Sequence, residues 1–241
     1  MIALICGTGS FPKEIFKILN KKKIKYIIIN LTERKLSKLE IKLKVGQFGQ
    51  LFKTLKENNC KEVIFAGKIM RPSLQNIRFD TVGLKILPAL YKIFKKGDYK
   101  ILNFIIKLLK KNKIKTISHT KYCKALTLYS NPTSSKPTTS NVADLKIAIN
   151  LFNKFKKDDL GQSIIVDECR IVGVEGAFGT DQIINNYKKF NKTRKKNTGI
   201  LVKIPKKNQD FEIDLPTIGY KTIKNCISAG LAGIYLKKGK N

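Results

Sequence analysis

The sequence is short of the residues on which many metalloenzymes and secreted proteins depend. Its 241 residues include one histidine, His119, and five cysteines that lie far apart without forming a C-x-x-C pair. Such a set cannot supply a zinc site from local pairs. Cys6 and Cys169 stand in apolar stretches and are expected in the core. Because no apolar run reaches the roughly 18 residues that span a bilayer, and no basic segment precedes the first apolar run, we expect a cytoplasmic protein.

Acidic residues are also scarce. There are 17 Asp and Glu against 49 Lys and Arg, which gives a formal net charge of +32. This excess suits a polyanionic partner such as nucleic acid, an anionic membrane or a phosphorylated substrate. Arginine, the usual base-reading side chain, is rare and the lysines are dispersed, so we expect no specific nucleic-acid partner. A strongly AT-biased genome would also produce abundant Lys, Ile and Asn, and the charge alone does not decide the partner.

The first half of the chain alternates short apolar runs with helical patterns. Strands are predicted at 2–6, 26–30, 62–66 and 115–118, with helices between them at 13–19, 46–58, 83–96 and 98–112. This alternation is typical of a parallel sheet with helices on both faces. We therefore predict an α/β fold with a Rossmann-like N-terminal domain over residues 1–130.

A polar stretch with two prolines follows, and residues 131–140 are predicted to link two domains. The second half then shows a helical pattern at 142–155 and a hairpin of strands at 163–166 and 171–174. Later elements are expected as a helix from 182 to about 190, a charged exposed loop at 191–197, a strand at 199–204, a helix at 220–229 and a strand at 232–236. We predict a second α/β domain with a mixed sheet over residues 141–241.

Two acidic residues and two glycines meet where the apolar run at 171–174 ends. Glu175 comes directly after this run, and Gly179, Thr180 and Asp181 precede the next helical pattern. Ligands in α/β sheets bind beyond the carboxyl ends of the strands, which makes this turn a candidate site. Thr180 or Asp181 can instead be a helix N-cap with no other role. Both interpretations stay open from these residues.

More charged residues surround the long polar loop at 205–219, where Lys203, Asp210 and Asp214 are found. Long loops in compact domains are often functional, and this one contains apolar and turn residues that favour such a role. Carboxylates combined with lysines, without a histidine or cysteine site, suit an oxygen-liganded metal such as Mg²⁺ that holds a phosphate ester. The chemistry expected is hydrolysis of a phosphate bond.

Two strand ends in the first half are candidates for phosphate contacts. Gly7, Gly9 and Ser10 form a G-x-G turn before a helix, whose N-terminal N–H groups can bind a phosphate. The turn lacks the third glycine of the dinucleotide fingerprint. Lys68 and Arg71 add basic groups after the third predicted strand.

Other functions are compatible with parts of the sequence. A nucleotide-dependent oxidoreductase would use the turn from Gly7 to Gly9, but the second strand ends in Asn30 where that class places an acid on the ribose. A basic module for RNA or membranes explains the charge but not the spaced acids. The segment 83–96, which mixes apolar residues with lysines around Pro88, fits a core helix or a helix that contacts a lipid surface.

Six stretches, in order along nearly the whole chain, carry a more specific resemblance. They are residues 5–12, 46–49, 65–73, 174–181, 201–210 and 214–219. Together they resemble the LpxI-type UDP-2,3-diacylglucosamine pyrophosphatases of lipid A synthesis. The resemblance implies two domains that close around a lipid, with catalysis and lipid binding in the domain over residues 141–241. It also implies Mg²⁺-dependent hydrolysis of UDP-2,3-diacylglucosamine to 2,3-diacylglucosamine 1-phosphate and UMP.

The resemblance also assigns roles to residues. It implies that Asp181 is the catalytic aspartate, and we place Glu175 beside it as a second catalytic residue and Mg²⁺ on Asp181 and Asp214. Substrate contacts are expected from Gly7, Gly9, Ser10, Lys68, Arg71, Gly179, Thr180, Lys203, Gln209, Asp210, Asp214 and Thr217. The expected partners are the lipid substrate and the anionic inner face of the inner membrane. The sequence does not decide whether the protein forms a homodimer.

Overall fold

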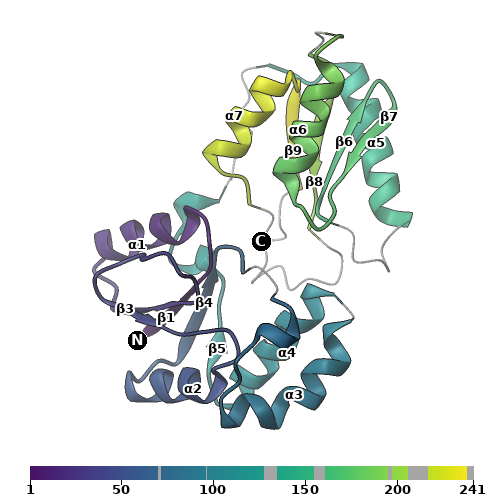
Figure 1. The fold of residues 1–241 in the computed structure, drawn as a ribbon. Coiled ribbons are helices and arrows are strands. Elements are labelled where there is room, and N and C mark those ends of the chain that lie inside the picture. The colour runs from purple at the N-terminus through teal and green to yellow at the C-terminus, as the bar shows by residue number, and fades with distance from the viewer. Residues whose placement is uncertain are drawn as a thin grey trace. The chain divides into compact units, whose positions relative to one another are not determined.

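The computed structural model describes residues 1–69, 72–95, 97–127, 135–154, 161–194, 197–205 and 217–237. The chain divides into two compact units, Met1–Thr127 and Leu128–Asn241, which are described separately (Figure 1). Residues 131–134 of the predicted linker at 131–140 lie outside the described residues, and helix α5 already begins at Thr139. Within the described part of the chain, no helix is both long and apolar enough to cross a membrane.

The first unit is built on a five-stranded parallel sheet with the strand order β3-β2-β1-β4-β5. The strands are β1 (Ile2–Cys6), β2 (Tyr26–Asn30), β3 (Glu40–Lys42), β4 (Glu62–Ala66) and β5 (Lys115–Thr116). β1 pairs in parallel with both β2 and β4, so the sheet grows in opposite directions from its centre. The predicted Rossmann-like parallel sheet is therefore confirmed. β3 was not predicted, because its three residues carry little apolar signal.

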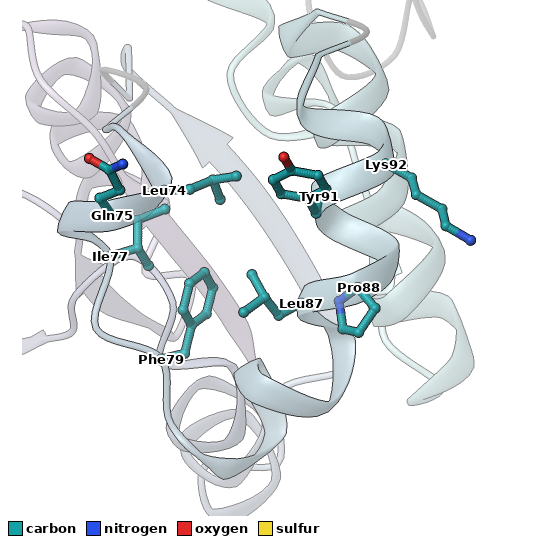
Figure 2. Close-up of a pocket in the computed structure, with 8 residues that line it drawn as sticks. All are labelled: Leu74, Gln75, Ile77, Phe79, Leu87, Pro88, Tyr91 and Lys92. Carbon is teal, nitrogen blue, oxygen red and sulfur yellow. The ribbon is translucent and has the colours of Figure 1, made fainter.

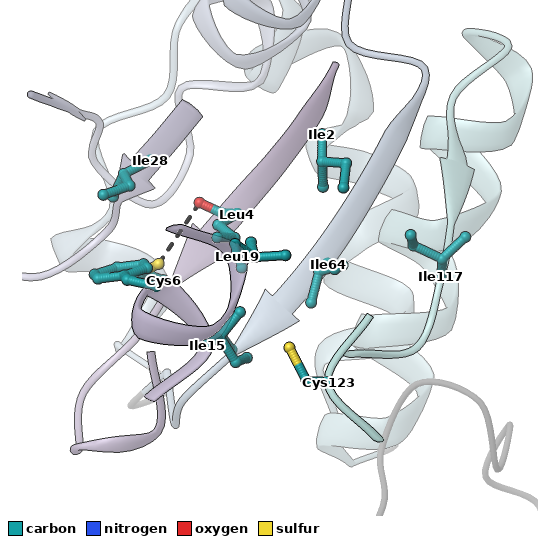
Figure 3. Close-up of a cluster of buried hydrophobic side chains, with 11 residues drawn as sticks. Ile2, Leu4, Cys6, Ile15, Leu19, Ile28, Ile64, Ile117 and Cys123 are labelled. Atoms are coloured by element: carbon teal, nitrogen blue, oxygen red, sulfur yellow. Dashed lines mark hydrogen bonds between the residues drawn. The ribbon is translucent and has the colours of Figure 1, made fainter. Parts of the chain in front are cut away.

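Helices cover both faces of this sheet. They are α1 (Phe11–Lys21), α2 (Phe48–Glu57) and α4 (Asp98–Lys111), whereas α3 (Thr81–Phe94) packs on α2 and α4. Successive side chains of a strand point to opposite faces, and the even-numbered side chains of β1 pack with α1 (Figure 3). Ala3 and Ile5 pack on the other face with Leu55 of α2 and Leu109 of α4. A central parallel strand is thus buried on both faces, which explains its unbroken apolar sequence.

One carboxylate joins the N-termini of α2 and α3. Asp80 Oδ1 accepts a hydrogen bond from the backbone N of Gly83 at 2.8 Å, and Oδ2 accepts one from the backbone N of Gln50 at 3.0 Å. The two helix ends lie so close together that a Cβ at Gly83 would be 2.4 Å from the carbonyl oxygen of Gly46. The stretch 46–49, one of those that carry the family resemblance, therefore has a clear packing role.

The second unit contains a four-stranded mixed sheet with the order β7-β6-β8-β9. Its strands are β6 (Ser163–Asp167), β7 (Arg170–Val174), β8 (Ile200–Lys203) and β9 (Gly233–Leu236). β6 is antiparallel to both β7 and β8, whereas β8 and β9 are parallel. Helix α5 (Thr139–Lys154) packs on one face, and α6 (Thr180–Asn191) and α7 (Tyr220–Ala229) pack on the other. The predicted mixed sheet is confirmed.

The predicted hairpin between β6 and β7 is also present, with one correction. Glu168 and Cys169 form its turn with φ angles of 49° and 62°, and positive φ at both central residues is typical of a tight hairpin. The backbone N of Cys169 donates to Asp144 Oδ1 at 2.7 Å, and burial raises the pKa of this carboxyl. Cys169 itself is exposed, so its expected place in the core was wrong. The apolar neighbours belong to the strands, whereas the cysteine lies at the tip between them.

A buried polar cluster closes the same end of the sheet. Asp167 is fully buried and accepts hydrogen bonds from Thr198 Oγ1 at 2.6 Å and from Tyr187 Oη at 3.3 Å. Arg194 also pairs with this carboxylate. Residues 191–197 were expected as a charged exposed loop, and Lys192, Thr193 and Asn197 are exposed. Asn191 departs from this expectation, because it ends α6, is buried and donates to a backbone oxygen of α7.

Candidate active site

The ends of three neighbouring strands bring polar residues together in the second unit. Ser163 begins β6, and Lys203 ends β8 directly opposite it in the register. The backbone N of Glu175, just after β7, donates to the carbonyl oxygen of Ser163 at 2.9 Å. Because β6 is antiparallel to both neighbours, its beginning lies beside their ends. The three residues therefore share one end of the sheet, and they come from well-separated parts of the sequence.

The hydroxyl of Thr180 is the centre of this group. It donates to Glu175 Oε1 at 3.1 Å and accepts a hydrogen bond from Lys203 Nζ at 3.1 Å. The hydroxyl of Ser163 lies 3.0 Å from the same oxygen. Since a threonine hydroxyl has one proton, and Glu175 accepts it, Ser163 is left as a donor. We refer to Ser163, Glu175, Thr180 and Lys203 as the Thr180 cluster.

Glu175 is held on both oxygens. While Oε1 accepts from Thr180, Oε2 accepts from the backbone N of Gln162 at 3.0 Å. A carboxylate tied in this way is well suited to fixing the orientation of a neighbouring hydroxyl and ammonium group. Both Thr180 and Lys203 are partly buried, so their positions are set by these contacts and by the strands that carry them.

Helix α6 begins at this cluster and carries Asp181 in its first turn. Its N-cap is Gly179, with φ of 82°, and no side-chain hydrogen bond caps the helix within the described residues. Neither Thr180 nor Asp181 is the N-cap, so the interpretation of these residues as caps was wrong. The side chain of Asp181 is 44% exposed, and its Oδ2 lies 3.6 Å from Lys221 Nζ. A carboxylate in the first turn is favoured by the helix dipole.

In the first unit, the turns after β1 and β4 are joined to each other. The backbone N of Thr8 donates to the carbonyl oxygen of Lys68 at 2.8 Å, and the N of Lys68 donates back to Thr8 at 3.1 Å. A Cβ at Gly7 would lie 2.5 Å from the Lys68 oxygen, which explains the glycine there. Gly9 has φ of 104° with open space around it, and Ser10 is the N-cap of α1. Gly7 is buried, whereas Gly9, Ser10 and Lys68 are exposed. These turns lie where the strand order reverses, the usual place of ligands in such sheets.

The other predicted site residues fall into two groups. Thr217 is described and exposed. Arg71, Gln209, Asp210 and Asp214 lie outside the described residues, so Asp181 is the described member of the expected magnesium pair. Across the described ranges, no three His, Cys, Asp or Glu side chains form a group that could hold a metal. Ser163 was missed by sequence reasoning, because a single serine at a strand end gives no distinctive pattern.

Asn30 stands where dinucleotide-binding folds hold a ribose-binding acid. It is fully buried, and its polar atoms are used inside its own loop. Oδ1 accepts hydrogen bonds from the backbone N and the hydroxyl of Thr32, each at 2.8 Å. Nδ2 donates to the carbonyl oxygen of Arg34 at 2.8 Å and to Glu40 Oε1 at 3.1 Å. This side chain orders the loop after β2 and is not presented to a ligand.

These units define an α/β protein with a doubly wound parallel sheet, a mixed sheet, and polar groups at the strand ends of both. The family model of the LpxI N-terminal domain matches residues 1–126, and that of the LpxI C-terminal domain matches residues 130–241. The chain belongs to the LpxI family. It is 28% identical over 248 residues to the UDP-2,3-diacylglucosamine pyrophosphatase LpxI of Caulobacter vibrioides, an alignment that covers 99% of this chain and 89% of the relative.

Proposed function

We propose that this protein hydrolyses the diphosphate bond of UDP-2,3-diacylglucosamine, giving 2,3-diacylglucosamine 1-phosphate and UMP. Water adds to one phosphorus, and the bridging oxygen leaves with the other. Membership of the LpxI family and the activity for which the Caulobacter relative is named support this substrate. The observation that carries the proposal is the Thr180 cluster, which holds a lysine ammonium group at the start of the helix that bears Asp181.

Each of these groups suits a diphosphate. The Lys203 ammonium and the N–H groups of the first turn of α6 favour negative charge. Asp181, with a partly exposed carboxylate, is proposed to accept the proton of the attacking water. Glu175 is proposed to act through Thr180 and Lys203 by keeping them in place. Gly7, Gly9, Ser10 and Lys68 are proposed as further substrate contacts on the first unit.

Mg²⁺ is proposed as the cofactor, with Asp181 and Asp214 as ligands. Asp181 fits this role because hard cations prefer carboxylate oxygens and because its contact with Lys221 is long, at 3.6 Å, and largely exposed. When bound, the ion would neutralise the developing charge on the phosphoryl oxygens. The excess of lysines further supports contact with the anionic inner face of the inner membrane, where a diacyl substrate is found.

The alternative functions have less support. A nucleotide-dependent oxidoreductase needs an acidic group on the ribose, and the hydrogen bonds of Asn30 are used in its own loop. A basic binding module for nucleic acid would not require the partly buried cluster of Glu175, Thr180 and Lys203. We therefore retain hydrolysis of the lipid-linked diphosphate as the function best supported.

Release of UMP from UDP-2,3-diacylglucosamine in detergent micelles tests the proposal directly. We expect UMP and 2,3-diacylglucosamine 1-phosphate in equal amounts with Mg²⁺, and loss of most activity after EDTA treatment that is restored by added Mg²⁺. Activity that is insensitive to EDTA would remove the metal from the mechanism. Absence of UMP release under any divalent ion would contradict the proposed function itself.

Substitutions at Thr180 test the role of the cluster. Thr180→Val keeps the shape but removes the hydroxyl that contacts Glu175 and Lys203, whereas Thr180→Ser keeps the hydroxyl. Misplacing catalytic groups by about 1 Å can cost on the order of a hundredfold in rate, so we expect the valine variant to lose roughly tenfold to a hundredfold in kcat. The serine variant should stay close to wild type. Equal kcat values for both variants, at equal melting temperatures, would show that the hydroxyl has no positioning role.

A further inference from the structure

The first unit contains an open apolar groove of about 700 Å³. One side is formed by the segment around the short 3₁₀-helix η1 (Leu74–Asn76), and the other by α3. Figure 2 shows Leu74, Ile77 and Phe79 facing Leu87 and Tyr91 across the groove. Pro88 lies next to Leu87 on α3, and Gln75 and Lys92 extend away from the other lining side chains. The inner lining is therefore almost wholly hydrocarbon and aromatic.

The groove lies beside a helix, α3, that is buried at only two of its described residues. Gly83 is buried against the end of α2, and Leu90 is buried further along, whereas the other residues of α3 are half-buried or exposed. An apolar helix with so little burial leaves hydrocarbon surface toward solvent. Tyr91, which lines the groove, is 56% exposed. Exposed apolar surface that is grouped in this way is typical of a binding site.

The charges around the groove indicate the sign of its ligand. Between residues 81 and 127 the chain contains many lysines and a single acidic residue, Asp98. Lys95 Nζ lies 5.8 Å from the centre of the Tyr91 ring, beside the groove lining, and Lys92 stands on the outer side of the same helix. An apolar slot with cations near one end complements a hydrocarbon chain joined to an anionic head group.

We propose that this groove binds one fatty-acyl chain of the lipid substrate. This inference rests on the proposed function for the identity of the lipid, and it assigns the acyl site to η1 and α3 of the first unit. Ligand pockets commonly have volumes of about 300–1,000 Å³ with mainly apolar linings, and the groove falls within that range. Its lining of side chains from two facing segments suits a flexible chain better than a compact ring. Binding there would cover the exposed Tyr91 and the other lining residues of α3.

The binding test uses 11-(dansylamino)undecanoic acid, whose fluorescence rises in an apolar site, and displacement by unlabelled fatty acids of increasing length. Leu87→Gln places an amide within the lining, whereas Leu84→Gln makes the same change on an exposed residue of α3 outside the lining. Because polar groups are costly in an apolar site, we expect Leu87→Gln to bind the probe at least about tenfold more weakly. Leu84→Gln should stay within about twofold of wild type.

A second variant keeps the proposal testable if Leu87→Gln does not fold. Leu87→Phe keeps the groove apolar but fills part of it, so the fatty acid length at which affinity stops rising should become shorter. Circular dichroism melting curves should show that each variant is folded. An unchanged length optimum in Leu87→Phe, together with wild-type probe binding in Leu87→Gln, would overturn the proposal.

Kinetics separate this proposal from the proposed function. In Leu87→Gln, KM for UDP-2,3-diacylglucosamine should rise while kcat changes little, and a UDP-glucosamine analogue with two acetyl groups should be hydrolysed as in wild type. If no substrate is hydrolysed by any variant, the proposed function fails, yet the probe measurement still decides the acyl site. If Leu84→Gln and Leu87→Gln lose sedimentation with anionic vesicles equally while both keep the probe, the face contacts membranes and the acyl site is wrong.

Discussion

Replacing Asp181 by Asn should lower the rate of UMP release by at least about a hundredfold while leaving the fold intact. The substitution removes one negative charge and one proton acceptor but keeps the size of the side chain. General base catalysis typically contributes about 10²–10⁴-fold, and the loss of a magnesium ligand adds to this. Steady-state kinetics at saturating Mg²⁺, with melting curves of both proteins, give the measurement.

The geometry of α6 makes this substitution informative. The N-cap of the helix is Gly179, so an effect of Asp181→Asn cannot arise from loss of a cap. The electrostatic effect of an acid in the first turn is only about 0.3–1 kcal/mol of stability, far too little to abolish activity through unfolding. Removing the negative charge beside a diphosphate should also leave substrate binding intact or tighter. A variant with near-normal turnover would transfer the catalytic role to Glu175, Asp210 or Asp214.

Lys221 supplies a matched control. It pairs with Asp181 at 3.6 Å, and its side chain is 81% exposed. If Asp181 acts only through this surface pair, Lys221→Met should be as damaging as Asp181→Asn. If the carboxylate acts on the substrate or the metal, as proposed, Lys221→Met should retain most of the wild-type rate. Comparable losses in the two variants would contradict a catalytic role for the carboxylate.

The largest effect on stability is expected for Asp167→Ala. This fully buried carboxylate accepts hydrogen bonds from Tyr187 and Thr198 and pairs with Arg194. Burial raises the pKa of Tyr187 to about 12, so its hydroxyl stays protonated and needs an acceptor. A buried donor left without one costs roughly 1–3 kcal/mol, and two are affected here. Urea denaturation should therefore show a loss of at least about 2 kcal/mol in the free energy of unfolding.

Glu168 provides the comparison for this effect. It contacts the same Arg194 at 2.7 Å, but its side chain is 37% exposed. Glu168→Gln should cost much less than Asp167→Ala, because exposed ion pairs contribute little to stability. Since Asp167 lies at the end of β6 opposite the Thr180 cluster, turnover of the folded Asp167→Ala fraction should stay close to normal. Similar losses in the free energy of unfolding for both variants would mean that burial of the Asp167 network contributes little to stability.

The sequence predicted the elements whose signal is local. Buried parallel strands such as β1 appear as unbroken apolar runs, and α7 was predicted with the bounds that the structure has. β3 was missed, because a short edge strand with the sequence Glu-Ile-Lys has no such pattern. The segment 191–197 was predicted to be exposed, and Lys192, Thr193 and Asn197 are exposed. The contacts of Asn191 with α7 and of Arg194 with Asp167 could not be predicted, because these partners are distant in sequence.

The candidate site was predictable in part for the same reason. Glu175, Thr180 and Asp181 are close in sequence, and their turn between a strand and a helix marked them as candidates. Ser163 joins them through the antiparallel pairing of β6 with β7, which a single sequence does not reveal. The hydrogen bond from the backbone N of Gln162 to Glu175 depends on the same pairing. Sequence therefore identified Glu175, Thr180 and Asp181, and the sheet determines how they can act together.

The joined turns of β1 and β4 restrict which mutations the protein can tolerate. A Cβ at Gly7 would meet the carbonyl of Lys68, and one at Gly67 would lie 2.5 Å from the carbonyl of Thr8. Each obstacle is main chain, so no second-site change of a side chain can relieve it. A suppressor screen that starts from Gly7→Ala should therefore yield reversion to glycine far more often than compensation elsewhere. Among related proteins whose neighbouring loops vary in sequence, we expect both glycines to be retained unless the backbone at the ends of β1 and β4 changes as well.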